Sequence, residues 1–138
     1  MNSVDEWRTL PSPDRDSEPY WRALAEGQFL LQRCRSCEHW TWPVRPICSN
    51  CHGEDLEWVE SPGRGEVYTW VITHQPYAPD LAKLTPYAVA LVRLDEQDDI
   101  LIPGRYVGDA ELSQGLRVRA QTERATEEIG LLTWNVDG

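Results

Sequence analysis

Cys34-Arg35-Ser36-Cys37 and Cys48-Ser49-Asn50-Cys51 are two Cys-x-x-Cys pairs separated by ten residues. Two residues between cysteines allow a tight turn that directs both sulfurs toward one point, and two such turns facing each other form a tetrahedral thiolate site. The spacer is shorter than the roughly 15–20 residues of one common zinc pattern, but it is long enough for an out-and-back hairpin. The four cysteines are therefore predicted to bind one metal ion.

A site built from four thiolates has no coordination position left for water or substrate, so the predicted metal is structural rather than catalytic. Zinc is the expected cofactor, and iron in a rubredoxin-like site is the alternative. His39 and His52 lie beside the two pairs, and we expect both to be outward polar neighbours rather than ligands. Such a site contributes on the order of 10–16 kcal/mol to folding at neutral pH, and a module of about thirty residues with a small core needs that contribution.

Composition and charge limit the location and the partners. The chain has 138 residues, with 23 acidic and 13 basic side chains and a formal net charge of −10. It begins without a basic or apolar signal segment and holds no apolar run near the roughly 20 residues of a membrane span, so we expect a cytoplasmic protein with reduced cysteines. Binding to nucleic-acid phosphates needs clustered basic residues, so neither nucleic acid nor an anionic membrane is an expected partner.

Residues 1–27 are predicted to form an N-terminal arm and a helix. Residues 1–16 have no periodic apolar pattern and are interpreted as an extended arm, with Trp7 and Leu10 as candidate anchors. Ser17 is a candidate N-cap and Gly27 suits the position after the C-cap, which bounds a helix of barely three turns. A helix this short has little stability of its own, so it must dock on the rest of the chain or on a partner.

The rest of the chain is predicted to contain two β-rich domains. Residues 28–60 form the zinc ribbon, in which alternating or apolar runs predict strands at 29–33, 40–44 and 56–60. Residues 61–138 form the second domain, with predicted strands at 65–74, 87–94, 99–107, 116–121 and 128–134 and one helical turn at 109–113. Strict alternation in the first of these five strands places Tyr68, Trp70 and Ile72 on one face.

Five short strands with a brief helix between the third and fourth are typical of an OB-type Greek-key barrel, and a plain five-stranded sandwich is the alternative. The predicted fold class is therefore mostly β. It consists of an N-terminal helix, a rubredoxin-like zinc ribbon and a five-stranded OB-fold barrel.

The sequence contains no arrangement that predicts catalysis by this chain alone. With the cysteines committed to metal no thiol nucleophile remains, and His74 at a strand end is interpreted as structural. Aromatic side chains are instead abundant, with seven Trp and five Tyr but one Phe. Because Trp and Tyr are enriched in interfaces, we predict a partner-binding surface that includes Tyr20, Trp21, Trp40 and Trp42.

Several blocks together resemble a known family, and the likeness runs from about Glu18 onward. They are Tyr20–Leu24 (YWRAL), Gly27–Cys34 (GQFLLQRC), Pro43–Cys48 (PVRPIC), Leu56–Val59 (LEWV), Gly63–Tyr68 (GRGEVY) and Pro86–Val92 (PYAVALV). Their order resembles Domain of Unknown Function family 35, whose small proteins join a zinc ribbon to an OB-fold. The chain departs from the family in having Glu38-His39 where a glycine usually follows the second cysteine.

The resemblance implies an accessory role. Members are similar to subunits that accompany thiolase-like and acyl-CoA enzymes, so this chain would be a non-catalytic but required subunit of a hetero-oligomer. The partner implied is a thiolase-like or lipid-transfer-protein-like aldolase that cleaves a β-hydroxyacyl-CoA in steroid side-chain degradation. A subunit of an acyltransferase or of an acetoacetyl-CoA thiolase complex is the alternative within the same class.

Two readings from other classes remain open. One is a single-stranded nucleic-acid-binding OB protein that stacks bases on Tyr68 and Trp70. The other is an acyl-CoA-binding module or enzyme in its own right, which would meet the CoA phosphates through basic side chains. The candidates for that contact are Arg64, Arg93, Arg105, Arg117 and Arg119.

Overall fold

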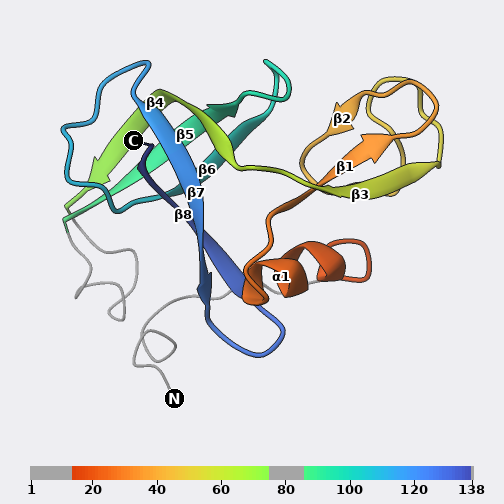
Figure 1. Cartoon of the computed structure of the whole chain (residues 1–138), viewed down its shortest axis with the longest axis horizontal. Helices are drawn as coiled ribbons and strands as arrows, with labels where there is room; N and C mark the ends of the chain where they lie inside the picture. Colours follow the sequence, from red (N-terminus) through yellow and green to blue (C-terminus); the bar gives the residue numbers. More distant parts are fainter. Residues whose placement is uncertain (1–13, 75–85, 138) are drawn as a thin grey trace.

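The computed structural model describes residues 14–74 and 86–137 (Figure 1). The predicted arm with Trp7 and Leu10, and residues 75–85, lie outside the described residues. The elements are α1 (Glu18–Ala25), β1 (Leu30–Cys34), β2 (Trp40–Thr41), β3 (Leu56–Glu60), β4 (Arg64–Thr73), β5 (Tyr87–Leu94), β6 (Leu101–Tyr106), β7 (Arg117–Arg124) and β8 (Gly130–Val136). In this part of the chain, no helix has both the length and the apolar character that crossing a bilayer requires.

The strands form two sheets, which confirms the predicted mostly-β fold. β2, β1 and β3 make a three-stranded sheet, and β4-β5-β6-β8-β7 close into a barrel. All neighbouring strands of the barrel are antiparallel except β6 and β8, which pair in parallel at Arg105 and Tyr106. This five-stranded closed order is that of an OB-fold, and it excludes the open sandwich.

Helix α1 begins directly after Ser17, as predicted, but the predicted capping by Ser17 is wrong, because its side chain makes no hydrogen bond to the amides of the helix. At its start the Ser17 hydroxyl accepts from the Asp14 amide at 3.1 Å, and the Ser17 amide donates to the Asp14 carboxylate at 2.8 Å. At its end Gly27 has a φ of 86°, and the amides of Gly27 and Gln28 donate to carbonyls of the last helical turn at 3.1 and 2.8 Å. This pair of bonds is a Schellman motif, and glycine satisfies its left-handed position without strain.

The sheet of the ribbon is asymmetric. β1 pairs with β3 along its whole length, from Leu30 opposite Glu60 to Cys34 opposite Leu56, but with β2 at two positions. The predicted strand at 40–44 is therefore too long, since β2 ends at Thr41. Pro43 has no amide hydrogen to continue the ladder, which accounts for the early end.

A β-bulge changes the predicted faces of the first barrel strand. Val67 pairs with Val92 and Thr69 with Leu91, so Tyr68 is an extra residue in β4. The prediction that Tyr68 and Trp70 share one face through strict alternation is wrong for this reason. Trp70 packs against the core, whereas Tyr68 is 42% exposed.

The predicted helical turn at 109–113 is also wrong. These residues form a bend and an irregular segment between β6 and β7. The Tyr106 hydroxyl donates to the Ala110 carbonyl at 2.7 Å, and the Leu116 amide donates to the Ser113 carbonyl at 3.1 Å. A helix of five residues gains too little from propagation to offset the cost of nucleation, and these local hydrogen bonds hold the segment instead.

Helix α1 docks on the ends of β7 and β8 beside the ribbon (Figure 1). Tyr20 and Leu24 are 3% and 1% exposed and join the barrel's core, which includes Val92 and the fully buried Trp134. The close approach is possible because β8 begins with Gly130. A Cβ there would lie 2.1 Å from the Leu24 carbonyl carbon and 2.2 Å from the Ala25 amide nitrogen.

We predict that Gly130→Ala lowers the free energy of unfolding by about 1–3 kcal/mol, because the new methyl group must displace the helix backbone. Urea denaturation followed by tryptophan fluorescence measures the loss. The control is Ser113→Ala in an exposed turn, which should change stability by less than about 0.5 kcal/mol. An unchanged midpoint for Gly130→Ala would contradict the docking of α1.

Candidate metal centre and adjoining groove

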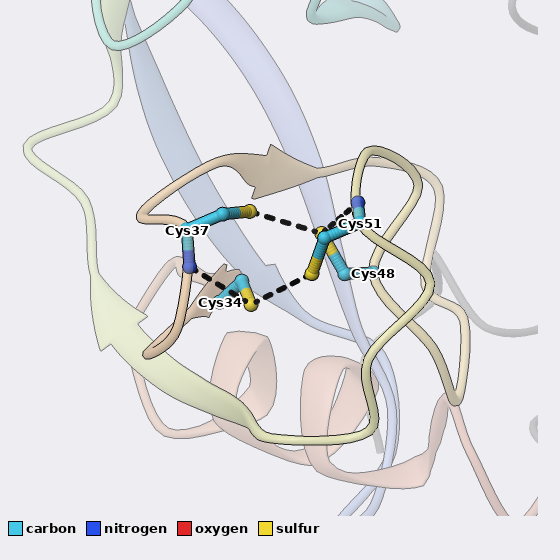
Figure 2. Close-up of side chains that lie close together, drawn as sticks. All are labelled: Cys34, Cys37, Cys48 and Cys51. Atoms are coloured by element: carbon cyan, nitrogen blue, oxygen red, sulfur yellow. Dashed lines mark hydrogen bonds between the residues drawn. The ribbon is translucent and has the colours of Figure 1, made fainter.

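The four predicted ligands converge at one end of the ribbon. Cys34 and Cys37 come from the turn after β1, and Cys48 and Cys51 come from the long segment between β2 and β3 (Figure 2). All four sulfurs lie within 4.8 Å of one another. The Cys34–Cys51 and Cys37–Cys48 sulfur distances are 3.7 and 3.6 Å. Sulfurs at the corners of a tetrahedron with metal–sulfur bonds near ~2.3 Å lie about 3.8 Å apart, so the geometry fits a four-coordinate metal.

The two turns have the same backbone conformation. In each, the amide three residues after the first cysteine points at its sulfur, as Cys37 does to Cys34 and Cys51 to Cys48, both at 3.5 Å. The residue after each pair has a positive φ, 66° for Glu38 and 63° for His52. Left-handed backbone usually favours glycine, so both turns carry side chains where glycine would be less strained.

Hydrogen bonds and neighbouring sulfurs shift the thiol pKa values in opposite directions. The Cys51 amide, followed by the Asn50 amide, lowers the pKa of Cys48 to about 6. The Cys37 amide likewise lowers the pKa of Cys34. The Gly53 amide lowers the pKa of Cys51, but the three neighbouring thiols outweigh it and raise that pKa to about 11. Ionising all four adjacent thiols therefore requires a nearby cation, which a divalent metal bound between the sulfurs would supply.

Neither histidine beside the site is placed as a ligand. In the described part of the chain, the group of side chains that could hold a metal consists of the four cysteines. His39 lies toward the barrel, with Nε2 at 3.4 Å from the Gln97 side-chain nitrogen and 4.0 Å from an Asp99 oxygen. His52 is exposed. The four-thiolate arrangement is therefore closed, as its composition predicts.

An apolar groove of about 660 Å³ lies between α1, the segment after β2 and the barrel strands β6 and β8. Trp21 lines it from the helix, Trp42 and Val44 from the ribbon, and Ile102 and Leu132 from the barrel. Three separate parts of the chain therefore build one hollow surface.

The four aromatic residues predicted to bind a partner occupy different environments. Tyr20 is 3% exposed, and its ring contacts those of Trp21 and Trp42 at centroid distances of 5.0 and 5.3 Å, so it supports both indoles from within. Trp21 and Trp42 are half-buried in the groove wall. Trp40 lies elsewhere, beneath the Arg33 guanidinium at 5.6 Å. Residues such as Val44 and Leu132 were missed because no local pattern marks a surface made from distant segments.

The residues that would bind nucleic acid or CoA phosphates in the two alternative hypotheses mostly make other contacts. Tyr68 lies under the Arg93 guanidinium at 4.9 Å, and Trp70 packs against the core. Three of the five candidate arginines have carboxylate partners, in the pairs Arg64–Asp137 at 3.8 Å, Arg93–Glu66 at 3.6 Å and Arg117–Asp95 at 2.6 Å. Arg105 lines the apolar groove, and Arg119 is exposed on β7. His74 is exposed at the end of β4.

We predict one tightly bound metal ion per purified chain, and its loss in Cys48→Ser, which removes a fully buried sulfur. Elemental analysis measures the metal, and a colourless solution distinguishes zinc from rubredoxin-like iron. A strong chelator should lower the melting temperature, because the metal binds only the folded chain and its binding free energy therefore stabilises the fold. The matched variant Ser36→Ala, exposed in the first turn, should keep the metal. Purified protein that contains no metal, and whose melting temperature does not change when chelator is added, would contradict the predicted site.

Comparison with known proteins places both halves of the chain in one family. Residues 21–57 match the profile described as "ChsH2, rubredoxin-like zinc ribbon domain", and residues 58–123 match "ChsH2, C-terminal OB-fold domain". A solved structure entitled "Ltp2-ChsH2(DUF35) aldolase" has a chain that is 30% identical, with a TM-score of 0.79, covering 91% of this chain and 98% of that one.

The chain matches some curated relatives over most of their length and others over only a part of a longer protein. A "DUF35 domain-containing scaffold protein" of Pyrococcus furiosus is 32% identical over 117 residues, which are 83% of this chain and 85% of the relative. A "Probable enoyl-CoA hydratase alpha subunit" of Thermomonospora curvata is 36% identical over 64% of this chain, and a "3-oxo-4,17-pregnadiene-20-carboxyl-CoA hydratase alpha subunit" of Mycobacterium tuberculosis is 30% identical over 92%.

The chain spans 27% and 40% of the length of these two hydratase subunits. By contrast, it spans most of the Pyrococcus relative, and it carries the ribbon, the barrel and the cysteine cluster together. The chain belongs to the DUF35 family, with a zinc ribbon and an OB-fold of the ChsH2 type.

Proposed function

We propose that this chain is a zinc-containing, non-catalytic subunit of a thiolase-like acyl-CoA enzyme, and that its catalytic partner is a lipid-transfer-protein-like aldolase. The observation that carries the proposal is the likeness, over 91% of this chain and 98% of the other, to a chain of an Ltp2–ChsH2 (DUF35) aldolase. The reaction is the retro-aldol cleavage of a β-hydroxyacyl-CoA from a steroid side chain. The pregnadiene-carboxyl-CoA named for one relative supports a steroid substrate.

The chemistry of the metal site supports an accessory role. Four thiolates complete the coordination of Zn²⁺, and the ion bound there supplies folding stability rather than Lewis acidity. Cys34 and Cys48 are buried, and backbone amides already point at their sulfurs. The acid, base and nucleophile of the reaction then belong to the partner, and this chain contributes a folded docking surface.

The groove supports a protein partner. Its half-buried indoles, Trp21 and Trp42, have the character of interface hot spots, with large apolar faces framed by aliphatic side chains. The thiolase-like partner of the proposal would cover these indoles. The Tyr20 ring packs against both indoles, and Phe29 contacts Tyr20 in turn, with their ring centroids 6.3 Å apart. The surface is therefore preorganised before the partner binds.

A second candidate reaction is hydration of an enoyl-CoA. Two relatives named as hydratase alpha subunits favour it, although each extends well beyond the segment that this chain matches. The two reactions differ in their products. Hydration adds water to a double bond and keeps the carbon skeleton, whereas retro-aldol cleavage releases two carbonyl compounds.

Co-expression tests the proposal. The lipid-transfer-protein-like aldolase of the same organism is produced with and without this chain, and cleavage of a steroid β-hydroxyacyl-CoA is followed by mass spectrometry. The pair should co-purify and be active, while the aldolase alone is insoluble or inactive. An aldolase that is soluble and fully active alone would reject the accessory role, and hydration without cleavage would favour the second reaction.

Trp21→Ala should weaken binding of that aldolase by about 30-fold, because a truncated hot-spot tryptophan costs on the order of 2 kcal/mol. Calorimetry on the two purified subunits measures the affinity. Tyr68→Ala is the matched control, since Tyr68 is an exposed aromatic residue outside the groove. Equal affinities for the two variants would contradict the groove as the docking surface.

A further inference from the structure

The turn between β5 and β6 reaches across to the zinc ribbon. The Trp40 amide donates to Gln97 Oε1 at 3.0 Å, and Gln97 Nε2 donates to the Trp40 carbonyl at 2.9 Å. One side-chain amide therefore satisfies both backbone groups of a residue in β2, as a neighbouring strand would. β2 is an edge of the ribbon sheet, so Gln97 covers the edge and joins the two domains at once.

The same turn is fixed to the linker and to the barrel by its two preceding residues. Glu96 accepts a hydrogen bond from the hydroxyl of Ser61, which is 6% exposed in the linker between β3 and β4. Asp95 accepts two bonds from the Arg117 guanidinium on β7, at 2.9 and 2.6 Å. The turn is thus anchored on the barrel, and it holds the ribbon at Trp40 and the linker at Ser61.

The ribbon side of this contact is tied directly to the metal ligands. Trp40 follows Cys37 by three residues, and the Cys34 amide donates to the carbonyl of His39, the residue before Trp40, at 2.9 Å. On the other side of Trp40, the Thr41 hydroxyl accepts from the amide of Ser49, which follows Cys48, at 3.2 Å. β2 is therefore bonded to both cysteine turns.

The groove wall continues from the same strand. Trp42 and Val44 follow β2 immediately and face Ile102 and Leu132 of the barrel across the groove. A rotation of the ribbon about the linker would move the first pair relative to the second. The position of β2 against the turn therefore contributes to the width of the groove, together with the packing of Trp42 on Tyr20.

We propose that Gln97 is a positioning residue that couples metal binding in the ribbon to the shape of the docking groove. With the metal bound, the cysteine turns hold β2 where the Gln97 amide can make both of its bonds, and the groove has the form that fits the partner. Without the metal, β2 is released from both turns and the groove wall moves with it. The part that concerns the partner rests on the proposed function, whereas the coupling itself does not.

Coupling of this kind is reciprocal. If bound metal stabilises the contact between Gln97 and Trp40, the contact must stabilise bound metal by the same factor. Gln97→Ala removes both bonds to Trp40, together with the bond from Gln97 Nε2 to Asp99 at 2.6 Å. It should therefore weaken zinc binding by about tenfold and accelerate hydrogen exchange of the Trp40 amide by at least about tenfold. A merely local role in the turn would leave zinc affinity unchanged.

The experiment uses the full chain. Zinc affinity is measured by competition with a chromophoric chelator, and amide exchange is measured by mass spectrometry on the zinc-loaded protein. Gln97→Glu keeps an acceptor for the Trp40 amide but places its second oxygen against the Trp40 carbonyl and against Asp99 Oδ1, which Gln97 Nε2 contacts at 2.6 Å. The effects of Gln97→Glu should therefore be at least as large as those of Gln97→Ala. Gln114→Ala, in an exposed turn, should match the wild type in both measurements.

The outcomes separate the coupling from the proposed function. Wild-type zinc affinity and wild-type exchange in a folded Gln97→Ala protein would overturn the coupling, whatever the partner does. If both change and the aldolase also binds about tenfold more weakly, the coupling and the docking groove are both supported. If both change while the aldolase binds as tightly as before, the coupling stands and the groove is not the docking surface.

Discussion

Four sulfur atoms within 4.8 Å of one another are the constraint on which the ribbon half of the chain depends. The amides around Cys48 favour its thiolate, while the neighbouring thiols suppress ionisation of Cys51. The protein groups around the cluster therefore do not favour ionisation of all four thiols, and a bound divalent cation would do so. The ribbon has two well-paired strands and one two-residue strand, so its sheet alone gives little cooperativity. The metal site supplies the cross-link between its two turns.

The parts of the structure that follow from local interactions could be predicted from the sequence. The spacing of the cysteines determines the two turns, and these turns recur with nearly equal φ at Glu38 and His52. Gly27 ends the helix through backbone bonds within a few residues of itself, and Asp14 binds the Ser17 amide just before the helix begins. Alternation along β7 buries Val118 and exposes its arginine neighbours, as the pattern predicts. In each case the deciding contact spans a short stretch of chain.

The parts that depend on distant contacts could not be predicted. Tyr68 becomes the extra residue of a bulge because β4 must pair with β5 and β7 at once, which no window within β4 reveals. Gly130 is an ordinary strand residue until α1 lies against it. Gln97 lies in a turn of charged residues, so the sequence predicts a solvent-exposed side chain. Its hydrogen-bond partner Trp40 is 57 positions away, and no local pattern indicates that contact. The groove was missed for the same reason, since its walls come from three segments.

A structural metal is usually assigned a local effect, but the proposed coupling extends its influence through the connectivity of the fold. β2 lies between the two cysteine turns, and the next residues along the chain form a wall of the groove. The opposite wall belongs to the closed barrel. In the proposed coupling the first wall depends on the metal and the second does not, so the width of the groove depends on how the two halves meet. The turn between β5 and β6 makes polar contacts at that junction. The shape of a binding surface of this design is therefore controlled in part by polar atoms outside its apolar lining.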